Sequence, residues 1–200
     1  MKAVIFDLGK VLVDYDHRQT LSALATLCRC DLATAAALFA EVDSRLGVGE
    51  LDSEGLYQFC LERTALEADL ETFVAAICTG LARNDEALAY AVALQQRPGI
   101  TIGVISNTIE AHVSWLDEQI PELAELDLVM MSNEVGLTKP DPEIFRLALD
   151  LLDVPAPQAL FVDDLAANVA AAQALGLHGI VHSDWSQTRP ALERWLAGAA

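Results

Sequence analysis

The chain has 200 residues, of which 53% are hydrophobic, and it carries 30 acidic against 12 basic side chains. A chain of this length forms one domain, or one domain with a sizeable insertion, and buries roughly 70% of the surface that its unfolded form exposes. The net charge of −18 argues against nucleic acid or an anionic membrane as a partner.

The cysteines and the N-terminal segment indicate a reducing compartment. Cys28, Cys30, Cys60 and Cys78 contain no C-x-x-C pair and have no neighbouring histidine pair, so we expect small buried thiols rather than a metal site or disulfides. The apolar run before Asp7 is too short for a signal peptide or a membrane span. We therefore expect a cytoplasmic protein.

The first element is the apolar run Val4-Ile5-Phe6, which ends at Asp7. It is too short for a helix and predicts a buried strand that delivers Asp7 to a loop. In an open α/β sheet the carboxyl ends of the strands form the ligand crevice. Asp7 is therefore the first candidate for chemistry, and a turn-capping role is the alternative.

The next part of the chain has helical rather than strand-like periodicity. Apolar residues recur at helical spacing from about residue 17 to residue 81 and predict about four amphipathic helices. We expect residues 15–81 to form a helical cap inserted after the first strand, and residues 1–14 and 82–200 to form the core. Such an insertion suits a lid or a specificity element, although a purely structural bundle would have the same pattern.

Helices and strands alternate in the remainder of the chain. Helices are expected at 85–96, 109–119, 141–152 and 166–175, and strands at 100–105, 126–131, 159–162 and 179–182. This succession predicts an α/β fold, in which a doubly wound, mostly parallel sheet is covered by helices on both faces.

Four polar clusters follow the expected strands or lie in the adjoining loops. They are Asp7, Ser106-Asn107, Lys139-Pro140, and Asp163-Asp164 with Asn168. Each has a simple alternative explanation: Ser106 could cap a helix, Lys139 could be a solvated loop residue, and the two aspartates could cap a turn. Because the carboxyl ends of the strands share one edge of such a sheet, the clusters together predict one crevice.

These segments resemble the haloacid dehalogenase-like superfamily of phosphohydrolases over nearly the whole chain. The matching residues are Phe6-Asp7-Leu8-Gly9, Ile105-Ser106-Asn107, Gly136 to Pro142, and Phe161 to Asp164 with Asn168. The resemblance implies a Rossmann-like core, a helical cap and catalysis through an aspartyl-phosphate with Mg²⁺. The Asp-Leu-Gly start and the Asp-Asp-x-x-x-Asn end look most like sugar-phosphate phosphatases and the phosphatase domains attached to epoxide hydrolases.

The resemblance implies a nucleophile and a set of metal ligands. Asp7 would attack the phosphate and, with Asp164 and the backbone carbonyl of Gly9, would bind Mg²⁺, which prefers hard oxygen ligands. Asp163 would be either a further ligand or a partner that orients the first ones. The cation is needed because a carboxylate that attacks a phosphate dianion faces charge repulsion.

The remaining motif residues would bind the phosphate. Ser106 and Asn107 are expected at the start of a helix, where free N–H groups and the helix dipole favour an anion. Lys139 would act as a positive charge between the nucleophile and the phosphate. Asn168 would hold Asp164 or Lys139 by a hydrogen bond.

The chain departs from the superfamily pattern at Gly9, where related phosphatases commonly carry a second aspartate. That aspartate protonates the leaving oxygen and later activates water, and such help is worth roughly 10²–10⁴ in rate. We therefore expect slower turnover unless another group substitutes. Asp14, Asp16 and His17 are the nearest candidates in the sequence, although a hinge or capping role explains them more simply.

Three basic residues near these motifs have no assigned role. Lys10 could contact the substrate phosphate, but pairing with surface carboxylates is the simpler interpretation in so acidic a protein. Arg18 and Arg45 in the expected cap could bind a distal group of the substrate, and a solvated surface role is again simpler.

The leading functional hypothesis is a Mg²⁺-dependent phosphatase acting on a small phosphorylated metabolite, with sugar phosphates as one class. A 2-haloacid dehalogenase that uses Asp7 on carbon is the second hypothesis, and Asp163-Asp164 disfavour it because that chemistry needs no metal. A non-catalytic binding module is the third, and the retained charged residues disfavour it because their burial costs stability. The sequence predicts neither the substrate nor the oligomeric state.

Overall fold

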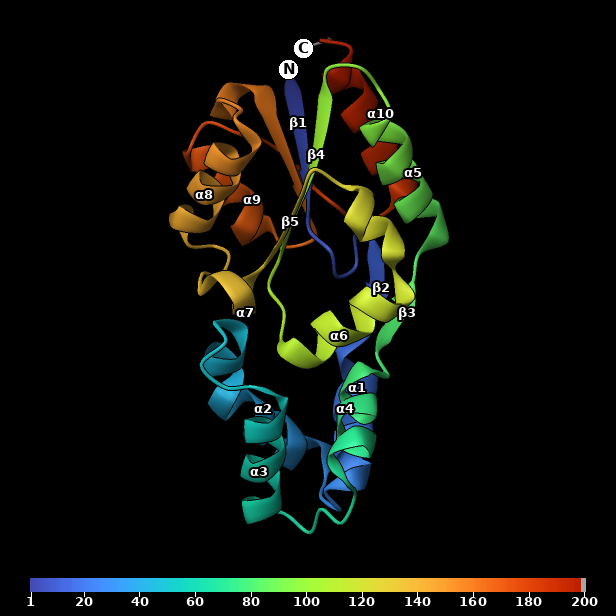
Figure 1. Ribbon diagram of the computed structural model, residues 1–200, viewed down its shortest axis with the longest axis vertical. Coiled ribbons are helices and arrows are strands. Elements are labelled where there is room, and N and C mark those ends of the chain that lie inside the picture. The colour runs from blue at the N-terminus through green and yellow to red at the C-terminus, as the bar shows by residue number, and fades with distance from the viewer. Residues whose placement is uncertain (199–200) are drawn as a thin grey trace.

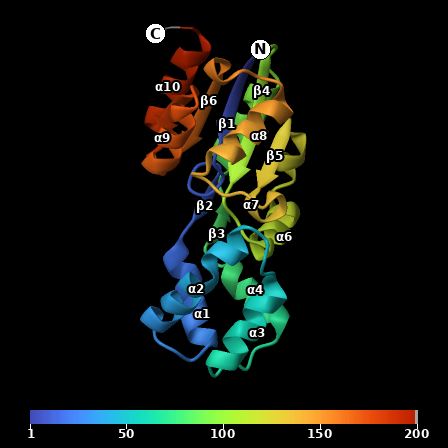
Figure 2. The ribbon, with the colours of Figure 1, turned by 90° about the vertical axis from the view of Figure 1, so that its left-hand side faces the viewer.

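The computed structural model of the chain describes residues 1–198 and has a sheet in one half and helices in the other (Figures 1 and 2). The sheet has five parallel strands. Across the sheet, their order is β5 (Leu128–Met131), β4 (Ile100–Ser106), β1 (Lys2–Phe6), β6 (Ala159–Asp163) and β7 (His178–Val181). The central strand is therefore the first one in the sequence.

Helices cover both faces of the sheet. The helices α5 (Asp85–Gln95) and α10 (Trp185–Leu196) lie on one side, and α8 (Pro142–Leu152) and α9 (Ala166–Ala174) lie on the other (Figure 1). Strand β1 explains this arrangement, because successive side chains point to opposite faces of a sheet. Val4 and Phe6 belong to one apolar cluster and Ile5 to the other, and all three are fully buried. The doubly wound α/β fold predicted from the sequence is thus confirmed.

The other half of the molecule consists of the four helices α1 (His17–Leu27), α2 (Leu32–Gly47), α3 (Ser53–Arg63) and α4 (Leu70–Cys78). Each begins after an aspartate whose carboxylate accepts a hydrogen bond from a backbone N–H of the first turn, as expected for an N-cap residue. The four helices share an apolar cluster that also includes Ile109 and Ala111, at the start of α6 (Glu110–Gln119). Helix α6 therefore joins the helical half to the sheet half.

The two halves are also joined by an antiparallel ribbon of β2 (Val13–Tyr15) and β3 (Leu81–Arg83), in which Asp14 pairs with Ala82. The chain leaves the sheet half through β2 and returns through β3. The sequence pattern did not predict this ribbon, because three-residue strands paired across more than 60 positions leave no local periodicity.

Four further elements were not predicted. They are α10, the short helix α7 (Ser132–Val135), and the 3₁₀ turns η1 (Pro121–Glu125) and η2 (Ala156–Gln158). Helix α10 contains Pro190, which usually argues against a helix interior. The strand expected from residue 126 begins instead at Leu128, and Asp127 accepts a hydrogen bond from the backbone N–H of Ile102.

The four cysteines are free thiols, and Cys28, Cys60 and Cys78 are buried. Burial raises the pKa of Cys60 to about 12 and that of Cys78 to about 11, so these thiols stay protonated at neutral pH.

Within residues 1–198, no single helix is both long and apolar enough to cross a membrane. Helices α1 and α2 meet that criterion only as a pair, and they are bent by 107°.

The parallel strands run from the end of the molecule that carries the two chain termini towards the helical half (Figure 1). Their carboxyl ends therefore lie at the junction of the two halves, where a ligand crevice is expected in an open α/β sheet.

Candidate active site

Lys139 lies at the centre of the polar groups at this junction. Its Nζ atom donates hydrogen bonds to Oδ1 of Asp7 at 2.5 Å, to Oδ2 of Asp163 at 2.8 Å and to the backbone carbonyl of Ile105 at 2.8 Å. These three acceptors engage all the donors of the ammonium group. Asp7 directly follows β1 and Asp163 ends β6, so two strands deliver carboxylates to one lysine.

The three charged groups are almost inaccessible to water. The exposed fractions of Asp7, Lys139 and Asp163 are 8%, 4% and 0%. Burial raises the pKa of Asp7 and the nearby Asp163 adds to this, whereas the Lys139 ammonium opposes it. Buried charges are stable only when paired, so Lys139 compensates two carboxylates at once.

A third carboxylate joins this pair. Asp7, Asp163 and Asp164 each offer an oxygen atom, and these atoms lie within 4.8 Å of one another. Asp164 is more accessible than the other two, and its Oδ2 atom lies 3.5 Å from Nζ of Lys10. Clustered carboxylate oxygens of this kind are the ligands that Mg²⁺ prefers. Lys10 thus pairs with a partly exposed carboxylate, and that carboxylate is a member of this cluster.

Asn168 holds Asp163 in place. Its side-chain amide lies 3.1 Å from both carboxylate oxygens of Asp163, and the backbone N–H of Leu165 donates to Oδ1 at 2.8 Å. The expectation that Asn168 would contact Asp164 or Lys139 was wrong. Because Asn168 lies on α9, directly after β6, its side chain reaches back to the aspartate that ends the strand.

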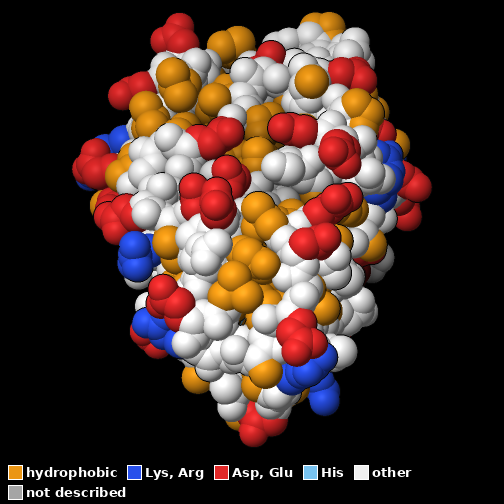
Figure 3. Space-filling view, turned by 60° about the horizontal axis from the view of Figure 1, so that its bottom comes forward, with side chains coloured by type: hydrophobic (Ala, Val, Ile, Leu, Met, Phe, Trp, Pro, Cys, Tyr) orange, Lys and Arg blue, Asp and Glu red, His pale blue; other side chains and the backbone are white. Residues whose placement is uncertain are grey.

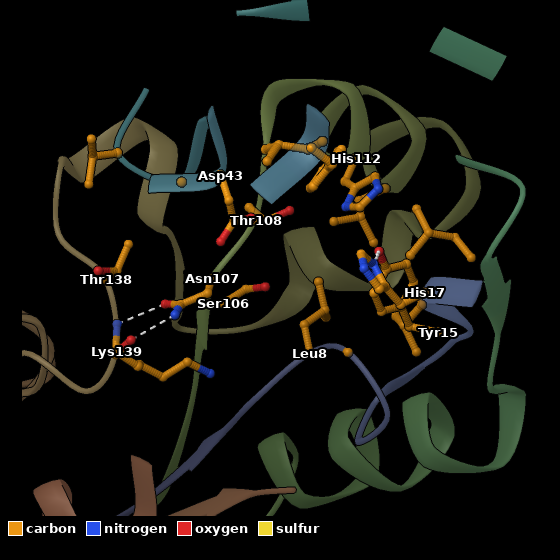
Figure 4. A pocket seen from close by; sticks show the side chains of 18 of the residues that line it. Leu8, Tyr15, His17, Asp43, Ser106, Asn107, Thr108, His112, Thr138 and Lys139 are labelled. Carbon is orange, nitrogen blue, oxygen red and sulfur yellow. Dashed lines mark hydrogen bonds between the residues drawn. The ribbon is translucent and has the colours of Figure 1, made fainter. Parts of the chain in front are cut away.

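Asn107 fixes the backbone of Lys139. Its side-chain amide donates to the carbonyl of Lys139 at 2.8 Å, and its Oδ1 accepts from the N–H of Lys139 at 2.8 Å (Figure 4). Neither Ser106 nor Asn107 is at the start of a helix, because α6 begins only at Glu110. Ser106 ends β4 and Asn107 lies in the loop that follows. The two residues are therefore not at a helix N-terminus, where the sequence predicted a phosphate site.

A cavity of about 470 Å³ lies beside these residues, between the edge of the sheet and the helical half (Figure 4). Ser106, Asn107 and Lys139 line it on the sheet side, together with Leu8 and Gly9 from the loop after β1. Its volume lies within the range of about 300–1,000 Å³ that is typical of small-molecule sites.

Of the three residues considered as substitutes for the missing aspartate, only His17 lines this cavity. Asp14 accepts a hydrogen bond from the side chain of Asn84, and Asp16 caps α1. Nδ1 of His17 lies 3.0 Å from the hydroxyl of Tyr15, which also lines the cavity. The structure thus gives Asp14 and Asp16 the structural roles that the sequence favoured.

Several residues that line the cavity gave no signal in the sequence. Tyr15, Asp43, Thr108 and His112 come from β2, from α2, from the loop after β4 and from α6. Nε2 of His112 is buried and has no hydrogen-bond partner within residues 1–198. Burial lowers the pKa of His112 to about 4, so this imidazole is neutral at pH 7. Only long-range folding brings these residues together.

The two arginines that were considered for a distal substrate group lie elsewhere. Arg18 lines a separate, shallow depression on α1, and Arg45 is exposed on α2 and does not line the cavity. Within the described part of the chain, Lys139 is the one lysine or arginine that lines it.

Comparison with known proteins gives three curated relatives of interest. The phosphoglycolate phosphatase of Rhodospirillum rubrum is 33% identical over 91% of this chain and 79% of that protein. The D-ribitol-5-phosphate phosphatase of Bacteroides thetaiotaomicron is 25% identical over 94% of this chain and 96% of that protein. The mouse acyl-CoA dehydrogenase family member 10 is 33% identical over 46% of this chain, and the matched region spans only 9% of the length of that mouse protein.

A solved structure matches the fold, and a family model matches most of the chain. A HAD family enzyme of Bacteroides thetaiotaomicron, crystallised with magnesium and inorganic phosphate, superimposes with a TM-score of 0.82 at 20% identity. The superposition covers 94% of this chain and 98% of that one, and it supports the fold alone. The model of haloacid dehalogenase-like hydrolases matches residues 1–176.

Proposed function

Because this chain belongs to the haloacid dehalogenase-like hydrolase family, we propose that it is a Mg²⁺-dependent phosphatase that hydrolyses a phosphate monoester of a small metabolite. The observation that carries the proposal is the buried ammonium of Lys139 between the carboxylates of Asp7 and Asp163, beside a cavity of small-molecule size. The phosphatases among the curated relatives support this reaction class.

In the proposed reaction, a carboxylate oxygen of Asp7 attacks the phosphorus atom and the ester P–O bond breaks. The leaving alkoxide takes up a proton and departs as an alcohol, which leaves an aspartyl-phosphate. Water then attacks the phosphorus of this intermediate and loses a proton to solvent, the bond between phosphorus and the Asp7 oxygen breaks, and inorganic phosphate and the carboxylate of Asp7 are released. Lys139 lowers the cost of bringing the Asp7 carboxylate close to the phosphate dianion.

Mg²⁺ would supply positive charge that neutralises the phosphoryl oxygens. Asp7, Asp164 and the carbonyl of Gly9 are the proposed ligands. Asp163 already accepts from Lys139, Leu165 and Asn168, so its role is to orient the other groups rather than to bind the metal. Ser106 would contact the phosphate, and Asn107 would act through the backbone of Lys139.

The helices α1 to α4 would serve as a cap over this site. In this proposal residues 15–81 form the cap, and residues 1–14 and 82–200 form the catalytic core. Phe39, Asp43 and Val48 of the helical half line the cavity next to Lys139, so the cap would select the organic part of the substrate. The partner would be a small phosphorylated metabolite of the cytoplasm rather than a nucleic acid or a membrane.

The test is a screen of phosphate monoesters, including sugar phosphates, with purified protein, with and without Mg²⁺. We expect hydrolysis that requires Mg²⁺ and that is lost in Asp7→Asn. No hydrolysis above the Asp7→Asn background would refute the proposal. Halide release from 2-haloacids without Mg²⁺ would identify a dehalogenase, and tight metabolite binding without turnover would identify a binding module.

A further inference from the structure

The lining of the cavity contains two charged side chains. Lys139 lies on the sheet side, where its ammonium is already paired with Asp7 and Asp163, and Asp43 belongs to α2 of the helical half. Within residues 1–198, no lysine or arginine other than Lys139 lines the cavity. The end that would receive the organic part of a substrate therefore has no fixed positive charge.

Asp43 adds a negative charge to this end. Its carboxylate extends from α2 into the cavity, above Asn107 and Thr108 in Figure 4. Among the ion pairs formed by the described residues, none involves Asp43. Burial raises the pKa of Tyr15, and the nearby charge of Asp43 adds to this effect. Asp43 is thus close enough to affect Tyr15, which also lines the cavity.

The molecule as a whole is acidic, with a net charge of −18. Acidic side chains are spread over the face shown in Figure 3, whereas lysines and arginines lie near its margins. The remainder of the lining is apolar or neutral, including Leu8, Val13, Leu81 and Leu116. Buried His112 adds a neutral imidazole whose Nε2 atom has no hydrogen-bond partner among residues 1–198 and can exchange a hydrogen bond with a hydroxyl group.

We propose that the cavity prefers phosphate monoesters whose organic part is uncharged, and that Asp43 disfavours organic parts that end in a carboxylate. This inference rests on the proposed function and names its substrate class. A second anion would approach Asp43 without a further cation in the cavity lining to compensate it, which is a repulsive element of specificity. The chain would therefore differ in preference from its phosphoglycolate-hydrolysing relative.

Two ligands of similar size isolate the effect of the charge. Phosphoglycolate ends in a carboxylate, and 2-hydroxyethyl phosphate carries a hydroxymethyl group at the same place. Their dissociation constants are measured by calorimetry with Mg²⁺ in the Asp7→Asn protein, which lacks the proposed nucleophile, so that binding is measured without turnover. At about pH 8.5 free imidazole is uncharged, so histidine protonation does not obscure the comparison.

We expect 2-hydroxyethyl phosphate to bind about tenfold more tightly than phosphoglycolate, a modest ratio because Asp43 is exposed and its charge is screened. Adding Asp43→Asn should reduce this ratio to about twofold, and Asp43→Lys should reverse it. The matched control is Glu41→Gln, which removes the same charge from the same helix outside the cavity lining and should leave the ratio unchanged.

Equal or tighter binding of phosphoglycolate would overturn the inference, as would a ratio that Asp43→Asn leaves unchanged or a failure of both ligands to bind. The outcome is separate from that of the proposed function, because the binding ratio is measured without turnover. The phosphatase assay of the protein with Asp7 intact tests the reaction itself.

Discussion

The ammonium of Lys139 lies 2.8 Å from Oδ2 of Asp163, a carboxylate with no exposed surface. The same ammonium binds Asp7. Lys139→Met keeps most of the side-chain volume but leaves two buried carboxylates without their cation. We expect a loss of about 3–5 kcal/mol in the free energy of unfolding, measured by urea denaturation, together with loss of phosphatase turnover.

A second substitution separates these two effects. Adding Asp163→Asn to Lys139→Met removes one uncompensated charge and should restore part of the free energy of unfolding, but not the turnover. A Lys139→Met protein as stable as the wild type would show that the charges at this site do not depend on the lysine.

Gly9 has room for the Cβ atom of a side chain. A Cβ atom added to Gly9 would have the Cβ of Tyr15 as its nearest neighbour, at 3.9 Å, and the backbone of Gly9 is not in the left-handed region. We expect Gly9→Asp to raise kcat, by up to roughly 10²-fold, because it adds a proton donor beside the cavity. The measurement is steady-state hydrolysis of the best substrate from the ester screen.

Gly9→Asn is the control, since it adds the same volume without a group that can transfer a proton. It should not raise kcat. An equal effect of both substitutions would mean that shape rather than proton transfer limits the rate, and no effect of either would point to another proton donor.

The parts of the fold that the sequence predicted are those with a local signal. Val4-Ile5-Phe6 is a continuous apolar run, as expected for a strand that is covered on both faces. The ribbon that pairs Asp14 with Ala82 depends on a contact between distant segments and left no such pattern. Helix α10 was missed because Pro190 interrupts its pattern, although Leu192 is fully buried against the sheet.

The candidate site likewise contains residues that the sequence identified and contacts that it could not predict. Asp7 and Asp163 stand at strand ends and Lys139 lies in the loop between α7 and α8. The alternation of strands and helices, with the carboxyl ends of the strands at one edge, was enough to predict that they converge. The sequence could not predict that Asn168 binds Asp163, because its reach depends on the angle between β6 and α9. Asp43 and His112 lie on helices that meet only in three dimensions.

The ion pair between Lys10 and Asp164 bears on metal affinity. Because Lys10 holds a carboxylate that is a proposed Mg²⁺ ligand, its ammonium competes with the ion. We expect Lys10→Ala to tighten Mg²⁺ binding by about two- to fivefold, since a partly exposed ion pair contributes at most about 1 kcal/mol. Calorimetric titration of the metal-free protein measures this.

Two further variants serve as controls for the Mg²⁺ titration. Arg146→Ala also removes one positive charge, from an exposed residue that pairs with Glu143, and should leave the affinity unchanged. Asp164→Asn should weaken it. Weaker Mg²⁺ binding in Lys10→Ala would show that Lys10 supports the metal site instead of competing with it.

The two hydrogen bonds between Asn107 and the backbone of Lys139 predict a positioning role. Asn107→Ala removes both and allows the lysine to shift, so we expect kcat/KM to fall by about 10- to 100-fold, mostly through kcat. The control is Asn84→Ala, which removes the cap of α5 and costs about 1 kcal/mol of stability without touching Lys139. A similar fall in kcat for both variants would indicate general destabilisation.

His112 makes the stability of the fold depend on pH. Burial lowers its pKa from 6.5 to about 4. When the pH falls below the pKa of this histidine in the unfolded chain, the unfolded chain binds a proton that the folded protein does not bind. The free energy of unfolding therefore falls as the pH decreases. The groups facing His112 are Tyr15 and His17, and both remain in the variant His112→Gln, which cannot titrate at this position.

We therefore expect the stability difference between the wild type and His112→Gln to shrink by about 2–3 kcal/mol between about pH 7 and about pH 4. Urea denaturation at each pH gives this difference. His182, whose pKa is also lowered by burial, is present in both proteins and its contribution cancels. A difference that stays constant over this range would mean that His112 takes up its proton in the folded protein as readily as in the unfolded chain, and that its burial does not keep it neutral.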